Sequence, residues 1–128
     1  MNVAAIIGEV LTAPSIYKMQ DGGESIVFFV VRVPGIKEDW EAKAYDENIP
    51  IAIPFKIIGT TYNHLSRGAL AQVNGALQRG RYPNLTGTWE ITVGVNASDV
   101  KILNKERFVK NKEAAKKQFK PRGENKDE

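Results

Sequence analysis

The apolar segments of this sequence are short, and glycine, proline or polar residues separate them. This pattern is typical of β-strands, and only one internal stretch, residues 60–67, has the character of a helix. The predicted strands are residues 3–11, 25–33, 49–58, 71–79 and 88–95, with residues 100–103 closing the set. The order is therefore strand, strand, strand, short helix, strand, strand.

Two prolines distinguish the third of these segments, residues 49–58. Ile51 and the other odd-numbered residues fall on one face, whereas Pro50 and Pro54 fall on the other. Each proline removes a backbone donor from the hydrogen-bond ladder. We therefore expect an edge strand, or a strand broken near its start.

This order of elements predicts an all-β protein, a five-stranded OB-fold barrel with one short helix between strands 3 and 4. Gly8 and Gly75 lie inside predicted strands, where they allow the bends or bulges that a small closed barrel needs. Turn residues predict a hairpin loop at residues 79–87. Residues 1–104 form the expected barrel domain, and residues 105–128 form a basic, flexible, largely disordered tail.

The charge of the 128-residue chain is unevenly placed. Residues 105–128 hold nine Lys and Arg against five Asp and Glu, a net charge of +4, while residues 1–104 have a net charge of −1. A nearly neutral body with a basic tail fits binding to a polyanion. The alternative is a tail that only keeps the protein soluble.

Several classes of function are disfavoured by residue content. The absence of cysteine excludes disulfides, zinc–thiolate sites and thiol catalysis. His64 is the only histidine and has no partner spaced for catalysis, and glycine-rich phosphate loops are absent. We expect no enzyme, no cofactor and no metal site.

Without a secretory signal or an apolar run of ~20 residues, we expect a cytoplasmic, nucleoid-associated protein that does not contact membranes. Phage, plasmid or organellar origin stays open.

Five local patterns occur in this chain in a characteristic order. They are VAAIIGEV at residues 3–10, APSI followed by MQDGG within residues 13–23, FKIIG at residues 55–59, LSRGALAQVNGALQR at residues 65–79 and VKIL at residues 100–103. Together they resemble the bacterial-type single-stranded DNA-binding proteins, and they span residues 1–103. The resemblance implies that bases stack on aromatic rings and that Lys and Arg neutralise phosphates. It also implies a homo-oligomer, most simply a homotetramer, that protects single-stranded DNA in replication, recombination and repair.

Eight residues form the expected nucleic-acid site. Tyr82 matches the family's aromatic residue in the loop between strands 4 and 5, and Arg79 and Arg81 beside it are expected to contact phosphates. A solvated hairpin is the alternative. The other candidates are Trp40 in the loop at residues 34–48, Lys56 on the third strand, Tyr17 and Lys18 in the loop before Gly22, and Phe29. Because Phe28 and Phe29 are adjacent in a strand, one must point into the core while the other can face a ligand or a subunit.

The sequence also departs from the family pattern. The family's two ligand-facing aromatic residues on the third strand align with Ala52 and Ile58, which cannot stack. The loop at residues 34–48 carries a net charge of −3, and the chain lacks an acidic, Phe-terminated tip that docks replication and repair proteins. These departures support an alternative function, an OB-fold replication accessory or interaction module of primosomal type that acts mainly through protein contacts. RNA is an alternative ligand, and Trp89 is expected in the core or at a subunit contact.

Overall fold

The structure is a computed structural model that describes residues 1–19 and 22–103. The expected disorder of residues 105–128 lies outside the described residues. The strands are β1 (Ala4–Val10), β2 (Ser15–Lys18), β3 (Ser25–Val33), β4 (Glu47–Pro54), β5 (Leu70–Pro83) and β6 (Trp89–Ile102). Between β4 and β5 lie the helix α1 (Phe55–Ile58) and a 3-10 helix, η1 (Gly59–His64). Neither is long and apolar enough to cross a membrane, and no other helix occurs in the described residues.

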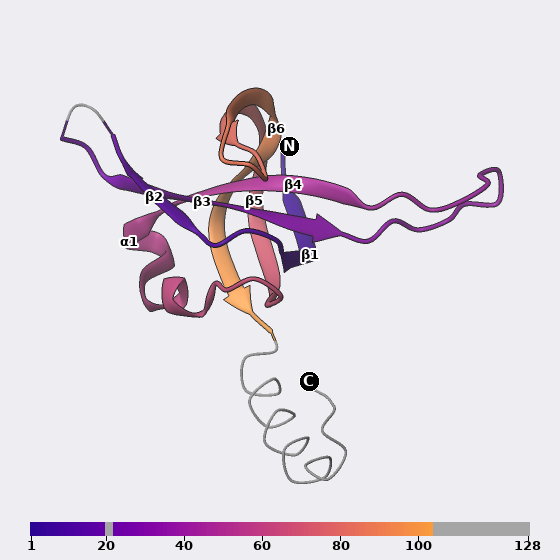
Figure 1. Cartoon of the computed structure of the whole chain (residues 1–128), viewed down its shortest axis with the longest axis horizontal. Coiled ribbons are helices and arrows are strands. Elements are labelled where there is room, and N and C mark those ends of the chain that lie inside the picture. The colour runs from indigo at the N-terminus through magenta and orange to yellow at the C-terminus, as the bar shows by residue number, and fades with distance from the viewer. Residues whose placement is uncertain (20–21, 104–128) are drawn as a thin grey trace, which may run out of the picture.

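Five strands close into the predicted OB-fold barrel (Figure 1). The strand order is β1-β5-β6-β4-β3, and pairing between β1 and β3 completes the ring. All neighbours are antiparallel except β4 and β6, which run parallel. The expected all-β barrel with a short helical segment before the fourth barrel strand is confirmed.

The sixth strand, β2, was not expected. It pairs with Ser25–Phe28 of β3, on the same edge that β1 occupies at Val31 and Arg32. Tyr17 and Lys18 therefore lie on a strand, and the prediction that they lie in a loop is wrong. Pairing with the first half of β3 holds these residues in an extended conformation.

The third predicted strand ends earlier than expected. β4 stops at Pro54, and Phe55–Ile58 form α1 instead of continuing the strand, while η1 ends before the predicted limit of the helix at residue 67. Pro54 cannot donate to a ladder, so the chain is free to turn there. β4 is also not an edge strand, because it lies between β3 and β6. However, its pairing with β6 is confined to Ile51 and Ala52, between the two prolines.

The longest hairpin joins β5 and β6, each of 14 residues. The turn lies at residues 84–88, where the Asn84 side chain accepts hydrogen bonds from the backbone of Thr86 and Thr88, each at 3.0 Å. The prediction of a loop at residues 79–87 is therefore wrong in its first half. The ladder shifts register between Asn74 and Gly75, which confirms a bulge at Gly75. A Cβ there would clash with the backbone oxygen of Asn96 in β6.

Side chains alternate between the inside and the outside of the barrel along β3 and β4. Val27, Phe29 and Val31 of β3 point inward and pack in the core with Ile51 and Ile53 of β4. The residues between them point outward. This alternation confirms the predicted period of two and defines an outer face that the next section describes.

Candidate nucleic-acid interface

A second apolar cluster lies on the outer face of β3 and β4. Its buried members are Phe28 of β3, Ala52 of β4 and Tyr82 of β5. Tyr17 and Trp89, both half-buried, pack against them. The outer end of the β5–β6 hairpin thus folds over the outer face of the barrel (Figure 1).

The four rings of this cluster meet edge to face. Phe28 lies at the centre, with ring centroids 5.6 Å from Tyr17, 5.3 Å from Trp89 and 6.3 Å from Tyr82. Tyr17 and Trp89 are 4.9 Å apart. We call Tyr17, Phe28, Tyr82 and Trp89 the outer aromatic cluster. Such packing fixes the rings, so the half-buried Tyr17 and Trp89 present oriented surfaces to solvent.

Tyr82 is not the exposed loop residue that was expected. It lies in β5, is only 3% exposed, and packs in one cluster with the small side chain of Ala52. Its hydroxyl donates toward two acceptors, the carbonyl oxygen of Gln78 at 3.0 Å and Oδ1 of Asn96 at 3.4 Å. Burial raises the pKa of the Tyr82 hydroxyl. In this structure Tyr82 shapes the outer face from beneath and offers no free ring face.

The two adjacent phenylalanines have opposite positions, and the candidate chosen from the sequence is the inner one. Phe29 is 2% exposed in the barrel core, so the prediction that it faces a ligand is wrong. Phe28 is the outward residue. Parity along β3 could have shown this, because Phe28 shares its face with the charged and exposed Arg32, whereas Phe29 shares its face with Val27 and Val31.

Trp89 was expected in the core or at a subunit contact, and the structure excludes the first of these positions. It does not enter the barrel core, and it packs on the outer aromatic cluster. The expected alternation with Ile91 and Val93 holds, but these residues are 69% and 40% exposed because the hairpin extends beyond the barrel. A long hairpin places residues of strand type outside the core, which periodicity alone cannot reveal.

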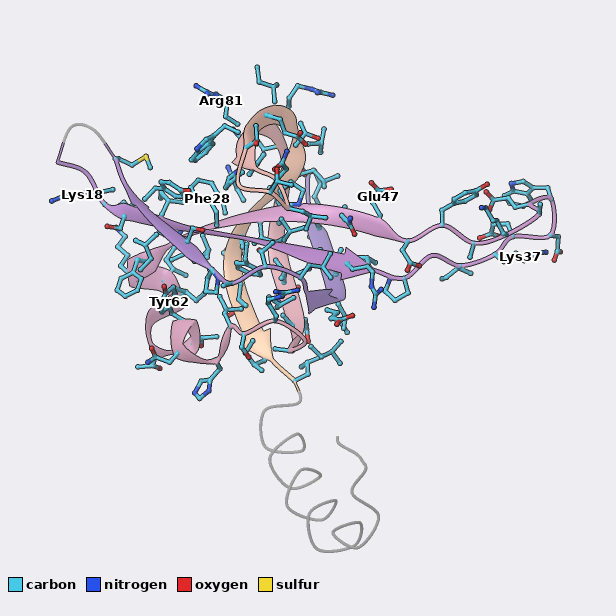
Figure 2. All side chains as sticks on the ribbon, in the orientation of Figure 1. Lys18, Phe28, Lys37, Glu47, Tyr62 and Arg81 are labelled. Atoms are coloured by element: carbon cyan, nitrogen blue, oxygen red, sulfur yellow. The ribbon has the colours of Figure 1, made fainter. Side chains whose placement is uncertain are left out.

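The side chains predicted to bind phosphates differ in whether a carboxylate already pairs with them. Arg79 and Arg81 are exposed on β5, and neither forms an ion pair within the described residues. Figure 2 shows Arg81 near the outer end of the β5–β6 hairpin. Lys18 is exposed at the end of β2. Lys56 lies on α1 rather than on a strand, and its Nζ is 3.0 Å from Oε2 of Glu24. The structure therefore brings Arg81 close to the outer aromatic cluster and leaves Lys56 engaged with a carboxylate.

Trp40 lies apart from all the other candidates. The connection between β3 and β4, residues 34–46, projects from the barrel as an arm, and Figure 2 shows Lys37 at its outer end, away from Phe28 and Arg81. Trp40 in this arm is 80% exposed and Tyr45 is 64% exposed. The Nζ of Lys43 lies 5.1 Å from the Tyr45 ring centroid. The arm thus carries exposed rings, but its net charge is negative.

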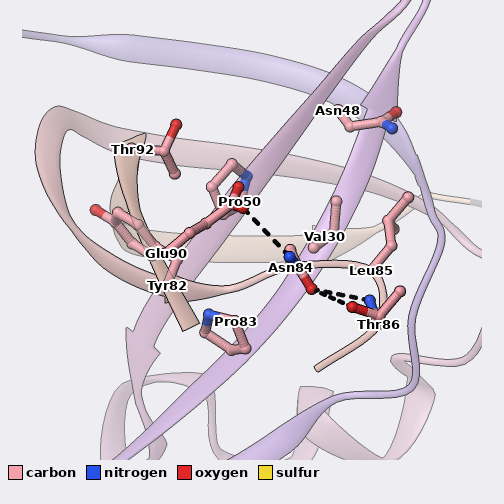
Figure 3. A pocket seen from close by; sticks show the side chains of 10 residues that line it. All are labelled: Val30, Asn48, Pro50, Tyr82, Pro83, Asn84, Leu85, Thr86, Glu90 and Thr92. Carbon is pink, nitrogen blue, oxygen red and sulfur yellow. Dashed lines mark hydrogen bonds between the residues drawn. The ribbon is translucent and has the colours of Figure 1, made fainter. Parts of the chain in front are cut away.

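Two grooves flank Tyr82 on the outer face. The central groove, of about 440 Å³, lies between the outward residues of β3 and β4, the helix α1 and the β5–β6 hairpin, and Arg81 lines it. The side groove, of about 310 Å³, lies under the turn at residues 84–88 (Figure 3). Glu90 lines the side groove, and its Oε2 accepts a hydrogen bond from Nδ2 of Asn84 at 3.2 Å. The central groove is the better place for an anion.

Two observations on the described residues concern metal-ligating and titratable side chains. Among them, no group of three or more His, Asp or Glu side chains is arranged to hold a metal ion. His64 lies at the exposed end of η1. The site is therefore a surface of rings, grooves and guanidinium groups.

Comparison with solved structures identifies proteins of the same fold, whereas comparison of the sequence finds no match. No known family model matches the sequence, and no curated protein matches it. Among solved structures, a Plasmodium falciparum SSB in complex with ssDNA is similar, with a TM-score of 0.63 and 20% identity over 80% of this chain and 95% of that chain. The dimeric N-terminal domain of PriB from Thermoanaerobacter tencongensis is similar with a TM-score of 0.55 and 20% identity, over 80% of this chain and 96% of that chain.

These likenesses establish the fold. The chain is an OB-fold barrel of the architecture found in SSB and PriB, as its resemblance to single-stranded DNA-binding proteins implied.

Proposed function

We propose that this protein binds single-stranded DNA, without reading its sequence, across the outer face of β3 and β4. Tyr17 and Trp89, the half-buried members of the outer aromatic cluster, contact the bases, while Arg79, Arg81 and Lys18 contact phosphates. The observation that carries this proposal is the juxtaposition of half-buried rings, a central groove and the exposed Arg81 on one face. Every base has a flat π-face, so ring contacts hold a strand of any sequence.

The likeness to an SSB that was solved with ssDNA supports the same ligand class. Protection of single strands during replication, recombination and repair is the corresponding role, and binding rather than enzymatic catalysis is its mechanism. We propose a cytoplasmic, nucleoid-associated location to match this role.

A homo-oligomer, in its simplest form a tetramer, belongs to this proposal. Ile7 of β1, Leu77 of β5, and Ile91 and Val93 of β6 are apolar side chains that are 40–69% exposed. Exposed apolar side chains of this kind suit contact with a further copy of the chain. Light scattering measures the mass of the complex directly.

The test is a titration of a labelled oligo-dT strand, followed by fluorescence anisotropy at two salt concentrations. We expect saturable binding that weakens with salt, because each phosphate contact on a single strand contributes about −0.7 to the slope of log K against log salt. A duplex of the same length is expected to bind more weakly, since its bases are not accessible to the rings. Absence of oligo-dT binding in dilute buffer contradicts the proposal.

A second candidate is an OB-fold interaction module of primosomal type that works mainly through protein contacts. The acidic arm with its exposed Trp40 favours it, as does the replacement of stacking residues by Ala52. Under this alternative, oligo-dT produces neither tryptophan quenching nor a change in sedimentation. RNA as the main ligand is distinguished by competing labelled oligo-dT with oligo-U.

A further inference from the structure

The outer face is hollow at the position where the sequence resemblance would place a flat ring. Ala52 occupies that position on β4, and the ring of Tyr82 approaches it from β5. The second aligned residue, Ile58, is 4% exposed in the core and does not reach the face. A DNA strand bound at this position meets a groove instead of a flat ring on which a base can stack.

The walls of the central groove are apolar, with a small number of polar groups on one side. Ile26, Pro54 and Ile57 contribute aliphatic surface from β3, β4 and α1. Gln78, Asn96 and Ser98 contribute amide and hydroxyl groups from the β5–β6 hairpin.

Part of this polar side remains available for a ligand. Nδ2 of Asn96 donates to Oε1 of Gln78, and Oδ1 of Asn96 lies 3.4 Å from the Tyr82 hydroxyl. Nε2 of Gln78 has no hydrogen-bond acceptor within the described residues, so its N–H groups can donate to a base oxygen.

The charged residues that line each groove indicate which class of ligand the groove fits. Arg81 is the only charged residue among the described residues that line the central groove, whereas Glu90 lines the side groove. Sites for small organic ligands measure about 300–1,000 Å³ and combine apolar walls with a few placed polar groups. A groove of about 440 Å³ with one guanidinium group at its margin fits a flat heterocycle that carries a phosphate.

We propose that the central groove receives one nucleobase of the bound strand, inserted between α1 and the β5–β6 hairpin, with Arg81 against the adjoining phosphate. This inference rests on the proposed function and specifies how one base is held. It differs from stacking on an exposed ring, because the base lies within the groove and its edge meets the amides of Gln78 and Asn96.

Two substitutions test the insertion by filling the groove from opposite walls. Ile57 is 48% exposed on α1 and Ser98 is exposed on β6, so Ile57→Trp and Ser98→Trp each add a ring where the fold has room to keep it. Ile16→Trp on β2 is the matched control, because Ile16 is 45% exposed and does not line the groove. Circular dichroism checks that each variant is folded.

The measured quantity is the ratio of affinities for oligo-dT and for a base-free deoxyribose-phosphate strand of the same length. We expect either groove-filling substitution to lower this ratio by about tenfold, the contribution of one base contact, while Ile16→Trp leaves it unchanged. Affinity for the base-free strand should persist in all variants, since Arg79 and Arg81 are retained.

Three outcomes decide the matter. A lowered ratio in a folded groove variant supports insertion. An equal or higher ratio overturns it, because a ring added at the margin then acts as a stacking platform or touches nothing. If the parent protein itself fails to bind oligo-dT, the proposed function fails together with the inference. Since the two variants act from different walls, either one suffices if the other does not fold.

Discussion

The outer face of the barrel and the arm at residues 34–46 both display aromatic side chains, yet their physical settings are opposite. On the barrel face, Phe28 and Tyr82 are almost buried and hold Trp89 in a packed cluster beside Arg81. In the arm, Trp40 is 80% exposed among carboxylates. A ring alone therefore does not define a nucleic-acid site, because packing must orient the ring and a nearby cation must attract the phosphate.

Stability gives the largest expected difference between the two regions. Phe28→Ala removes the centre of the outer aromatic cluster and should lower the free energy of unfolding by about 3–5 kcal/mol. Trp40→Ala removes an exposed ring and should change it by less than about 0.5 kcal/mol. Urea unfolding of both variants measures the contrast. Similar losses in both would show that the arm packs on the barrel.

Affinity for single-stranded DNA gives the next contrast. Trp89→Ala should weaken oligo-dT binding by about 1–3 kcal/mol, because a half-buried, oriented ring is lost from the face. Trp40→Ala should leave the affinity within about twofold, since the negative arm repels phosphates. Anisotropy titrations at one salt concentration are sufficient. The reverse order of effects would place the ligand on the arm.

Salt dependence separates the cations of the two regions. Arg81→Gln should make the slope of log K against log salt shallower by about 0.7, the value for one phosphate contact on a single strand. Lys37→Gln, in the arm, should leave the slope unchanged. Titrations at four salt concentrations provide both slopes. A slope that responds to Lys37 and not to Arg81 would contradict the assignment.

The smallest effect concerns the hydroxyl of Tyr82 at alkaline pH. Its burial raises the pKa of the folded state above the ordinary value of the unfolded chain, near 10. The stability that this pKa difference contributes is fully present below the pKa of the unfolded chain. It is lost as the pH rises through the pKa of the folded state. Unfolding free energies between about pH 9 and 11 should thus fall more steeply for the parent than for Tyr82→Phe. Equal slopes in the two proteins would contradict this assignment.

The architecture of the barrel was predictable because apolar periodicity and turn residues depend on local sequence. The alternation around Ile51 correctly assigned the inner face of β4, and Gly75 correctly marked a bulge. The end of β4 was not predicted, because apolar residues continue through Ile58 while Pro54 ends the ladder. Ile58 is apolar because the helix α1 covers the core. In the sequence, a buried apolar residue of a short helix looks the same as one of a strand.

The site was predicted less well because it depends on contacts between distant segments. Gly80 and Pro83 favoured a loop, yet Gly80 lies within β5, where a Cβ would stand 3.7 Å from the ring of Tyr82. A Cβ at that distance makes an ordinary van der Waals contact, so packing does not require this glycine, and the strand continues through it. Trp40 lies in the connection between two strands, as expected, and the contact with a ligand that the sequence predicted for it is what the tryptophan titration below tests.

The most direct measurement uses the two tryptophans as separate reporters. Trp40→Phe leaves Trp89 on the barrel face as the only tryptophan, and Trp89→Phe leaves Trp40 in the arm. Titration of both variants with oligo-dT should quench the fluorescence of Trp89 strongly and reversibly with salt, and should leave that of Trp40 nearly constant. Quenching confined to Trp40 would contradict the claim that the packed outer face of the barrel holds the strand.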